Sequence, residues 1–330
     1  MTERDHRAFT DAPAVRSAVP VLLGLVGPSG SGKTYSALRL ASGIRRVTGG
    51  DIYVIDTESR RALHYAERFE FRHVPFAAPF GPLDYLDAIE HCSARGAKVL
   101  VIDSMSHEHE GPGGVLEQHD AEVERLSGGD AAKGERVKML AWQRPKAARR
   151  RLIQRVLQLG INAVFAFRAK EKLKIAPGKP PVPLGWMPIA GEEFLYEMTA
   201  CCMLLPGAGG VPTWRFDDEA RGTREIAKLP EQFRSILGSL DGPLSEDVGA
   251  QIATWASGTA PAASEAHERI AAMIATARSN DELAALRPAL EAAKAARSVT
   301  PAEYRALGAA ARVRRETLGA DAPREPGAEG

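Results

Sequence analysis

Eight consecutive residues near the N-terminus have the types and spacing of a loop that binds phosphate groups. Glycines in such a loop let backbone N–H groups point inward at an anion, and a helix that starts directly after it adds its positive end. The pattern also needs a lysine that reaches the β- and γ-phosphates and a hydroxyl that ligates magnesium. The residues are Gly27, Pro28, Ser29, Gly30, Ser31, Gly32, Lys33 and Thr34. They predict a site for ATP with Mg²⁺.

The segments on either side of this loop are those that a phosphate-binding loop needs. An apolar run at 21–26 precedes it and predicts a buried strand, and residues 33–47 have the spacing of a helix. This context favours a nucleotide site over a chance glycine-rich turn. Tyr35 is a further candidate to contact the nucleotide, and packing in the core would explain it equally well.

Two acidic residues follow predicted strands. Asp103 comes directly after the apolar run 98–102, and Glu58 follows the run 51–56. At the carboxyl edge of a parallel sheet, Asp103 could hold Mg²⁺ and its water shell, and Glu58 could orient and deprotonate an attacking water. The alternatives are an aspartate that caps a turn and a solvated loop glutamate. The upstream loop favours the metal for Asp103, whereas Glu58 gains its role only from the resemblance described below.

Basic residues follow the last predicted core strand, at 161–167. Arg168 stands where ligands bind in open α/β sheets, so it could sense the γ-phosphate within its own subunit or act as an arginine finger on a neighbour. The alternative is a cation on a surface hairpin, because residues 170–185 hold four prolines and several lysines. For Lys172 and Lys174 we expect that hairpin role. We expect Trp186 to anchor the loop rather than to stack a base.

A dense run of basic side chains lies between residues 133 and 155. Such a run could follow a nucleic-acid backbone. It could equally be the solvated face of a helix whose core side carries Leu152, Val156 and Leu159. The formal net charge of the chain is +1, so its overall charge does not favour a polyanionic partner. The nine basic residues are Lys133, Arg136, Lys138, Arg144, Lys146, Arg149, Arg150, Arg151 and Arg155, with Glu135 as the one acid.

The segment His107-Glu108-His109-Glu110 has residue types that bind metals, but the pattern does not predict a structural metal site. We expect an extended segment here, in which alternate side chains face opposite ways, and no partner cysteine or histidine group is evident. Glu108 is instead a candidate to place water or Mg²⁺. The three cysteines, at 92, 201 and 202, form no C-x-x-C pair and are expected to be reduced core residues of a cytoplasmic protein.

Strands alternate with helices along most of the chain, which predicts an α/β fold with a mostly parallel sheet and helices on both faces. Further strands are expected at about 71–76, 198–205 and 213–216, the last two antiparallel. Further helices are expected at 82–95, 114–126 and 135–159, the last with a kink near Pro145. The expected domains are a disordered arm (1–19), a nucleotide-binding domain (20–256), a linker (257–264), three helices at 265–278, 280–297 and 301–318, and a disordered tail (319–330). We see no signal peptide and no membrane span.

The order of these motifs resembles the RecA-type ATPase core, in which a phosphate-binding loop precedes a strand that leads to a catalytic glutamate and a strand that ends in Asp-Ser. The stretch from Asp103 to Gly114 is similar to AAA-type ATPases of phages and prophages, some of them linked to single-strand annealing, as are residues 163–170 and 194–198. The resemblance covers about 20–235. It implies a RecA-like P-loop domain with Glu58 as the catalytic base. The chain differs from the recombinases proper at Phe167-Arg168, where they have a polar Asn-Gln pair.

Three functions are compatible with these residues. The first is an ATPase that acts on DNA, single-stranded in particular, in phage-type recombination or annealing, with Lys33 and Arg168 as charge stabilisers and with a homo-oligomer as one possible state. The second is a nucleotide-gated adaptor or loader with little turnover, which binds a replication or recombination protein through its C-terminal helices. The third is a small-molecule kinase, for which the sequence shows no acceptor pocket.

Overall fold

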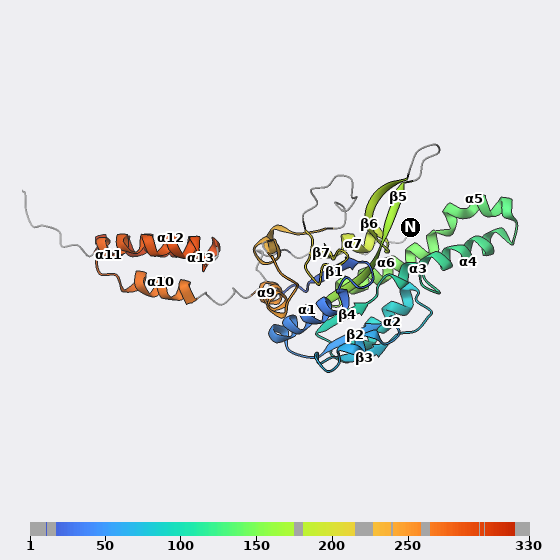
Figure 1. The fold of residues 1–330 in the computed structure, drawn as a ribbon, viewed down its shortest axis with the longest axis horizontal. Coiled ribbons are helices and arrows are strands. Elements are labelled where there is room, and N and C mark those ends of the chain that lie inside the picture. Colours follow the sequence, from blue (N-terminus) through green and yellow to red (C-terminus); the bar gives the residue numbers. More distant parts are fainter. Residues whose placement is uncertain are drawn as a thin grey trace, which may run out of the picture. The chain divides into compact units, whose positions relative to one another are not determined.

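Seven strands form one mostly parallel sheet, and this confirms the predicted α/β fold (Figure 1). The computed structural model describes residues 11, 18–174, 181–214, 227–238, 240–258, 265–296, 298–299 and 301–320. Along the sheet the strand order is β3-β2-β4-β5-β1-β7, and β6 pairs with β5. The strands are β1 (Leu22–Gly27), β2 (Ile52–Asp56), β3 (Arg72–Pro75), β4 (Val99–Asp103), β5 (Asn162–Lys174), β6 (Val182–Pro188) and β7 (Ala200–Met203).

Helices cover both faces of the sheet because successive strand residues point to opposite sides. Leu23 and Leu25 of β1 belong to the apolar core under α1 (Lys33–Thr48) and α9 (Glu246–Ala256). Leu22 and Val26 belong to the opposite core, under α2 (Pro82–Ala94) and α6 (Gln143–Gln158). Since the parallel strands run the same way, the residues after β1, β2 and β4 and those midway along β5 meet at one edge.

Two glycines allow α1 and α9 to pack with their backbones in close contact. A Cβ atom on Gly43 of α1 would lie 1.8 Å from the carbonyl oxygen of Glu246, and one on Gly249 of α9 would lie 2.2 Å from that of Leu40. Arg39 donates from Nε and Nη2 to the Glu246 carboxylate, at 2.9 and 2.7 Å. The helix that carries the end of the phosphate-binding loop is therefore held at a fixed distance from its neighbour.

We predict that Gly43→Ala destabilises the fold by about 1–3 kcal/mol or more, because a side chain there must push two helix backbones apart. Gly134→Ala is the matched control, since its Cβ would meet only ordinary contacts, 3.7 Å from Val123 at the nearest. We expect that control to be neutral or stabilising by about 0.5–1 kcal/mol, from helix propensity. Urea unfolding of both variants measures the difference. Equal stability of the two variants would contradict the packing described here.

Strand β7 runs parallel to β1, so the predicted antiparallel direction is wrong. The chain reverses once at the β5–β6 hairpin and again at α7 (Glu192–Tyr196), and two reversals restore the original direction. The antiparallel contact expected further on is a single bridge between Met203 and Thr213, and residues 215–216 of that predicted strand lie outside the described residues. The predicted hairpin after Arg168 is confirmed, with β5 continuing to Lys174.

The helix predicted at 135–159 is two helices, α5 (Ala131–Ala141) and α6, which meet at Trp142. The break comes before Pro145 because a proline is tolerated in the first turn of a helix, where its missing N–H needs no partner. α5 starts earlier than predicted because the Asp130 side chain caps it by accepting from the Lys133 N–H, at 2.9 Å. The helix predicted at 114–126 is confirmed as α4 (Val115–Ser127). It packs along α5, and Figure 1 shows this pair extending away from the sheet.

The chain divides into two compact units, Met1–Thr259 and Ala260–Gly330. The second unit contains α10 (Glu265–Thr276), α11 (Asn280–Ala285), α12 (Arg287–Ala295) and α13 (Pro301–Ala320), around a small core that includes Ile270, Ile274 and Leu307. The middle predicted helix is split in two at Leu286, two residues before Pro288. Most of the predicted arm, linker and tail lie outside the described residues; Val19 of the arm donates its N–H to the Ala256 carbonyl.

Shorter elements complete the first unit: η1 (Arg61–Tyr65), α3 (His107–Glu110), η4 (Glu231–Phe233) and α8 (Arg234–Leu237). Among the helices of the described residues, none combines the length and the apolar composition that a membrane span needs. The three cysteines are buried and unpaired, as predicted.

Candidate nucleotide-binding site

The loop between β1 and α1 has a shape that depends on its glycines. Gly30 and Gly32 have φ angles of 79° and 90°, in the left-handed region that side chains disfavour. A Cβ atom on Gly27 would lie 2.4 Å from the Leu204 carbonyl oxygen and 2.5 Å from Ser31 Oγ. Ser31 is fully buried and donates to the Pro28 carbonyl at 2.9 Å. The residues therefore fit a loop whose backbone approaches a bound phosphate closely.

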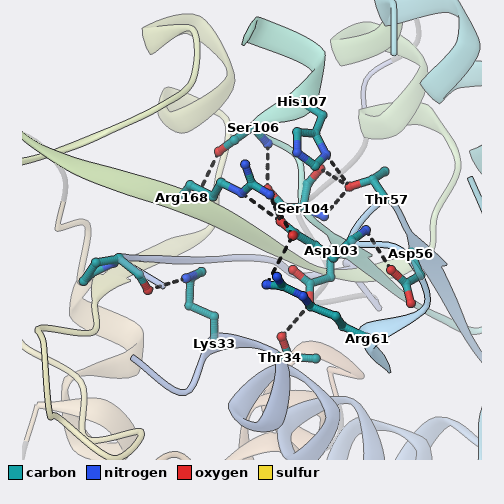
Figure 2. A network of polar contacts seen from close by, with 12 residues as sticks. Lys33, Thr34, Asp56, Thr57, Arg61, Asp103, Ser104, Ser106, His107 and Arg168 are labelled. Carbon is teal, nitrogen blue, oxygen red and sulfur yellow. Dashed lines mark hydrogen bonds and ion pairs between the residues drawn. The ribbon is translucent and has the colours of Figure 1, made fainter. Parts of the chain in front are cut away.

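Lys33 points its ammonium group back into this loop. Its Nζ donates to the Pro28 carbonyl at 2.7 Å (Figure 2). Burial lowers the pKa of Lys33, and the neighbouring carboxylates of Asp103 and Glu58 oppose that shift. A cation with few protein partners, at the mouth of a helix N-terminus, is suited to a phosphate group.

Asp103, at the end of β4, contacts the first turn of α1. Thr34 Oγ1 donates to Asp103 Oδ2 at 2.5 Å. Burial raises the pKa of Asp103 to about 6, although the hydrogen bond from Thr34 by itself lowers this pKa. Two adjacent oxygens of this kind suit the hard ion Mg²⁺, which typically takes only one or two protein ligands besides water and substrate phosphates.

The turn after β2 holds Glu58 in a defined position. Asp56, the last residue of β2, accepts from the Glu58 N–H at 2.8 Å and from the Ala62 N–H at 3.0 Å. Ser59 and Arg60 have positive φ angles of 57° and 68°, so the backbone turns sharply between these two bonds. The buried aspartate thus fixes the loop that carries Glu58, in a way that sequence reasoning did not predict.

Glu58 and Arg168 form a two-pronged ion pair. Arg168 donates from Nε and Nη2 to the two carboxylate oxygens of Glu58, at 2.8 and 2.7 Å. Burial raises the pKa of Glu58, but the bonds and charge of Arg168 outweigh it and the net shift is downward. Both predicted residues lie at the same edge, and Glu58 is ionised with both oxygens engaged.

Backbone pairing brings Arg168 beside the phosphate-binding loop. In the parallel pairing of β1 with β5, Arg168 is the partner of Gly27. Its N–H donates to Ser106 Oγ at 2.8 Å. Ser104 N–H donates to Thr57 Oγ1 at 2.8 Å, and His107 Nδ1 contacts the same oxygen at 2.7 Å (Figure 2). These bonds tie the ends of three neighbouring strands together.

A cavity of about 710 Å³ joins these side chains. Its lining contains the predicted residues Lys33, Thr34, Glu58, Asp103 and Arg168, which follow or end β1, β2 and β4 or lie midway along β5. Tyr35 does not line it: its ring packs on Tyr65 and Phe69, with centroids 5.7 and 5.4 Å away. Lining residues that sequence reasoning missed are Arg61, His64, Tyr65, Glu110, Ala169 and Ile189. The only signal for the first three was their closeness to Glu58 in sequence.

Comparison with known families identifies the part of the chain that builds this cavity. Residues 20–198 match the family described as the AAA domain. The chain belongs to the AAA domain family. Membership indicates a nucleotide-binding domain of the ATPase type, and the matched residues include the whole cavity lining. No curated protein is similar enough to the chain to count as a relative.

Within this AAA domain, the segment 107–110 does not have the structure or the role predicted for Glu108. It is a helical turn, α3, rather than an extended segment. Glu108 is buried and accepts from Arg149 Nε and Nη2 at 2.9 and 2.8 Å. It therefore faces α6 instead of the cavity. The described residues contain no group of three or more metal-binding side chains.

The basic run of the AAA domain is divided among several environments. Leu152 and Val156 are buried, as predicted for the core side of α6. Arg149 is also buried by its pair with Glu108, so it cannot contact nucleic acid. Ion pairs join Arg155 to Glu90, Arg144 to Glu122 and Lys138 to Glu135. Trp186 packs half-buried against the core under α2 and α6. The side chains of Lys172 and Lys174 lie outside the described residues.

Proposed function

We propose that the chain binds and hydrolyses ATP with Mg²⁺ in the 710 Å³ cavity. The observation that carries this proposal is the convergence of Lys33, Thr34, Glu58, Asp103 and Arg168 on one cavity. Its volume falls within the range of about 300–1,000 Å³ that is usual for small-molecule and cofactor sites. The AAA domain family supports a nucleotide as the ligand.

Each side chain has a role that follows from its position. The N–H groups of the loop and Lys33 would bind the phosphates, and Thr34 Oγ1 and Asp103 would hold the metal. When bound, Mg²⁺ neutralises charge on the phosphate oxygens. Glu58 accepts a proton from the attacking water, and it is a stronger base for this step once its bonds to Arg168 break. Arg168, once released, can direct its guanidinium at the γ-phosphate.

Removal of the metal tests the role of Asp103. We expect wild-type protein to bind ATP more tightly with Mg²⁺ than with a chelator. Asp103→Asn should lose most of this difference, because an amide is a poorer magnesium ligand than a carboxylate. The control is Asp51→Asn, since Asp51 precedes β2 at the opposite edge of the sheet and pairs with Arg72. Isothermal titration calorimetry measures the affinity of each of the three proteins with Mg²⁺ and with the chelator. Equal dependence on Mg²⁺ in Asp103→Asn and wild type would contradict this assignment.

We further propose that the ATPase acts on DNA in recombination or single-strand annealing, as the resemblance of Asp103–Gly114 and its neighbours implies. Exposed cations of α5 and α6 support it: Lys133, Lys146, Arg150 and Arg151 are exposed, and none forms an ion pair with a described residue. Arg168 is about one-third exposed, so it could also reach the nucleotide of a neighbouring copy as an arginine finger.

A second candidate function is a nucleotide-gated adaptor that binds ATP with little turnover and contacts a protein partner through its C-terminal helices. The ion pair of Glu58 with Arg168 favours it, since the bonds and charge of Arg168 lower the pKa of Glu58 and make it a weaker base toward water. Stimulation of turnover by DNA would support the ATPase. Intact ATP binding with turnover at background would support the adaptor.

A further inference from the structure

The joint between α5 and α6 carries an aromatic and cationic stripe outside the nucleotide cavity. Trp142 stands at the joint, and Lys146 and Arg150 follow at intervals of four residues, which places the three on one helix face. Met139, one turn earlier, is 83% exposed. We refer to Met139, Trp142, Lys146 and Arg150 as the elbow stripe. No role in nucleotide binding explains it, because none of the four lines the cavity.

The Trp142 indole is held in place while remaining partly open to solvent. It stacks on the His119 ring of α4, with centroids 4.1 Å apart and planes inclined by 24°. His119 is fixed in turn by the Lys138 carbonyl at 3.0 Å and by Asp120 at 3.1 Å. Lys146 Nζ lies 5.9 Å from the indole centroid. An indole immobilised beforehand loses little side-chain entropy when another ring stacks on it.

The cations of the stripe have no acidic partner among the residues that the structure describes. Lys146 and Arg150 are exposed, and no described acidic residue pairs with either. The neighbouring Arg151 is likewise exposed and unpaired, and α6 itself contains no acidic residue. By contrast, Arg149 and Arg155 of the same helix are neutralised by Glu108 and Glu90. Positive charge is therefore left on one side of α6, next to the tryptophan.

We propose that the elbow stripe binds single-stranded DNA by stacking an unpaired base on Trp142 while Lys146 and Arg150 bind flanking phosphates. This inference rests on the proposed DNA role of the ATPase and names the surface that carries it. Aromatic side chains beside a positive track are the means by which proteins bind single strands without sequence preference. A duplex offers no free base face to an indole, so single strands bind more tightly than duplex DNA.

The test is the affinity of the full-length protein for a labelled oligothymidylate of about 30 nucleotides, followed by fluorescence anisotropy. Trp142→Ala weakens binding about 5- to 150-fold, the effect of losing one stacked base. Lys146→Ala with Arg150→Ala reduces the slope of log affinity against log salt by about 1.4, since each single-strand phosphate contact contributes about 0.7. The double variant changes only exposed side chains and keeps the test valid where Trp142→Ala fails to fold.

Arg155→Ala is the matched control, because it removes a cation of the same helix that is paired with Glu90; it leaves affinity within about twofold of wild type. The proposal is overturned if wild type binds the oligonucleotide and the stripe variants bind it equally well. DNA would then bind to another surface of the protein. If wild type binds ATP but no oligonucleotide at low salt, the DNA role itself fails and this inference with it.

Discussion

Lys33→Ala is expected to weaken the binding of ATP with Mg²⁺ about 10- to 100-fold, the loss that follows removal of a hydrogen bond to a charged group. Turnover should fall further, by about 10²–10³-fold, because the same cation stabilises charge that develops on the transferred phosphoryl group. The reason is structural: Lys33 Nζ lies within the loop, 2.7 Å from the Pro28 carbonyl, and it lines the cavity. Calorimetric titration and phosphate release measure the two effects.

Lys98→Ala is the control for this experiment. Lys98 is an exposed lysine that immediately precedes β4, and its side chain contacts Gly50 at the opposite edge of the sheet. We expect it to leave ATP affinity unchanged. If Lys33→Ala also bound ATP like wild type, the assignment of the cavity as the phosphate site would be wrong, whatever the ATPase activity.

Glu58→Gln is expected to preserve ATP binding and to lower turnover about 10²–10⁴-fold, the contribution typical of a positioned general base. Glutamine keeps the size of the side chain and one hydrogen-bond acceptor, but it cannot take the proton of water. It also replaces the ion pair with Arg168 by a weaker contact. Single-turnover hydrolysis with saturating protein separates this loss from any change in affinity.

Glu70→Gln is the control, because Glu70 is an exposed glutamate that pairs with Arg45, away from the lining of the cavity. It should hydrolyse ATP like wild type. If Glu58→Gln and wild type hydrolysed ATP at the same measurable rate, Glu58 would not be the base. If both stayed at background while binding ATP, the adaptor function would replace the ATPase.

Several residues of the cavity could be predicted from the sequence because local patterns determine their positions. Lys33 and Thr34 belong to a motif with fixed spacing, and Asp103 ends an apolar run that had to be a buried strand. Parallel strands bring such ends to one edge, so the meeting of Thr34 with Asp103 follows from the fold class. The pairing of Glu58 with Arg168 required more, since 110 residues separate them and only the strand order β2-β4-β5-β1 brings them together.

The expectations that were wrong depended on long-range contacts. The sequence around Glu108 suggested that its carboxylate could place water or Mg²⁺. Arg149, 41 residues later, instead pairs with this carboxylate inside the protein. The direction of β7 depends on α7, a five-residue helix too short for periodicity to reveal. Trp142 at the α5–α6 joint stacks on His119 of α4, and no local sequence pattern predicts that these two side chains meet. Local patterns predict which residue types can do chemistry, and tertiary packing decides which of them remain free to do it.

The most direct test of the central proposal is steady-state phosphate release from ATP by the full-length chain, with Mg²⁺ and with a chelator, in the presence and absence of single-stranded DNA. We predict turnover that requires Mg²⁺, rises when single-stranded DNA is added and disappears in Glu58→Gln. Phosphate release by wild type that stays at background, with ATP bound and with Mg²⁺ and DNA both present, would contradict the proposal that this chain is an ATPase.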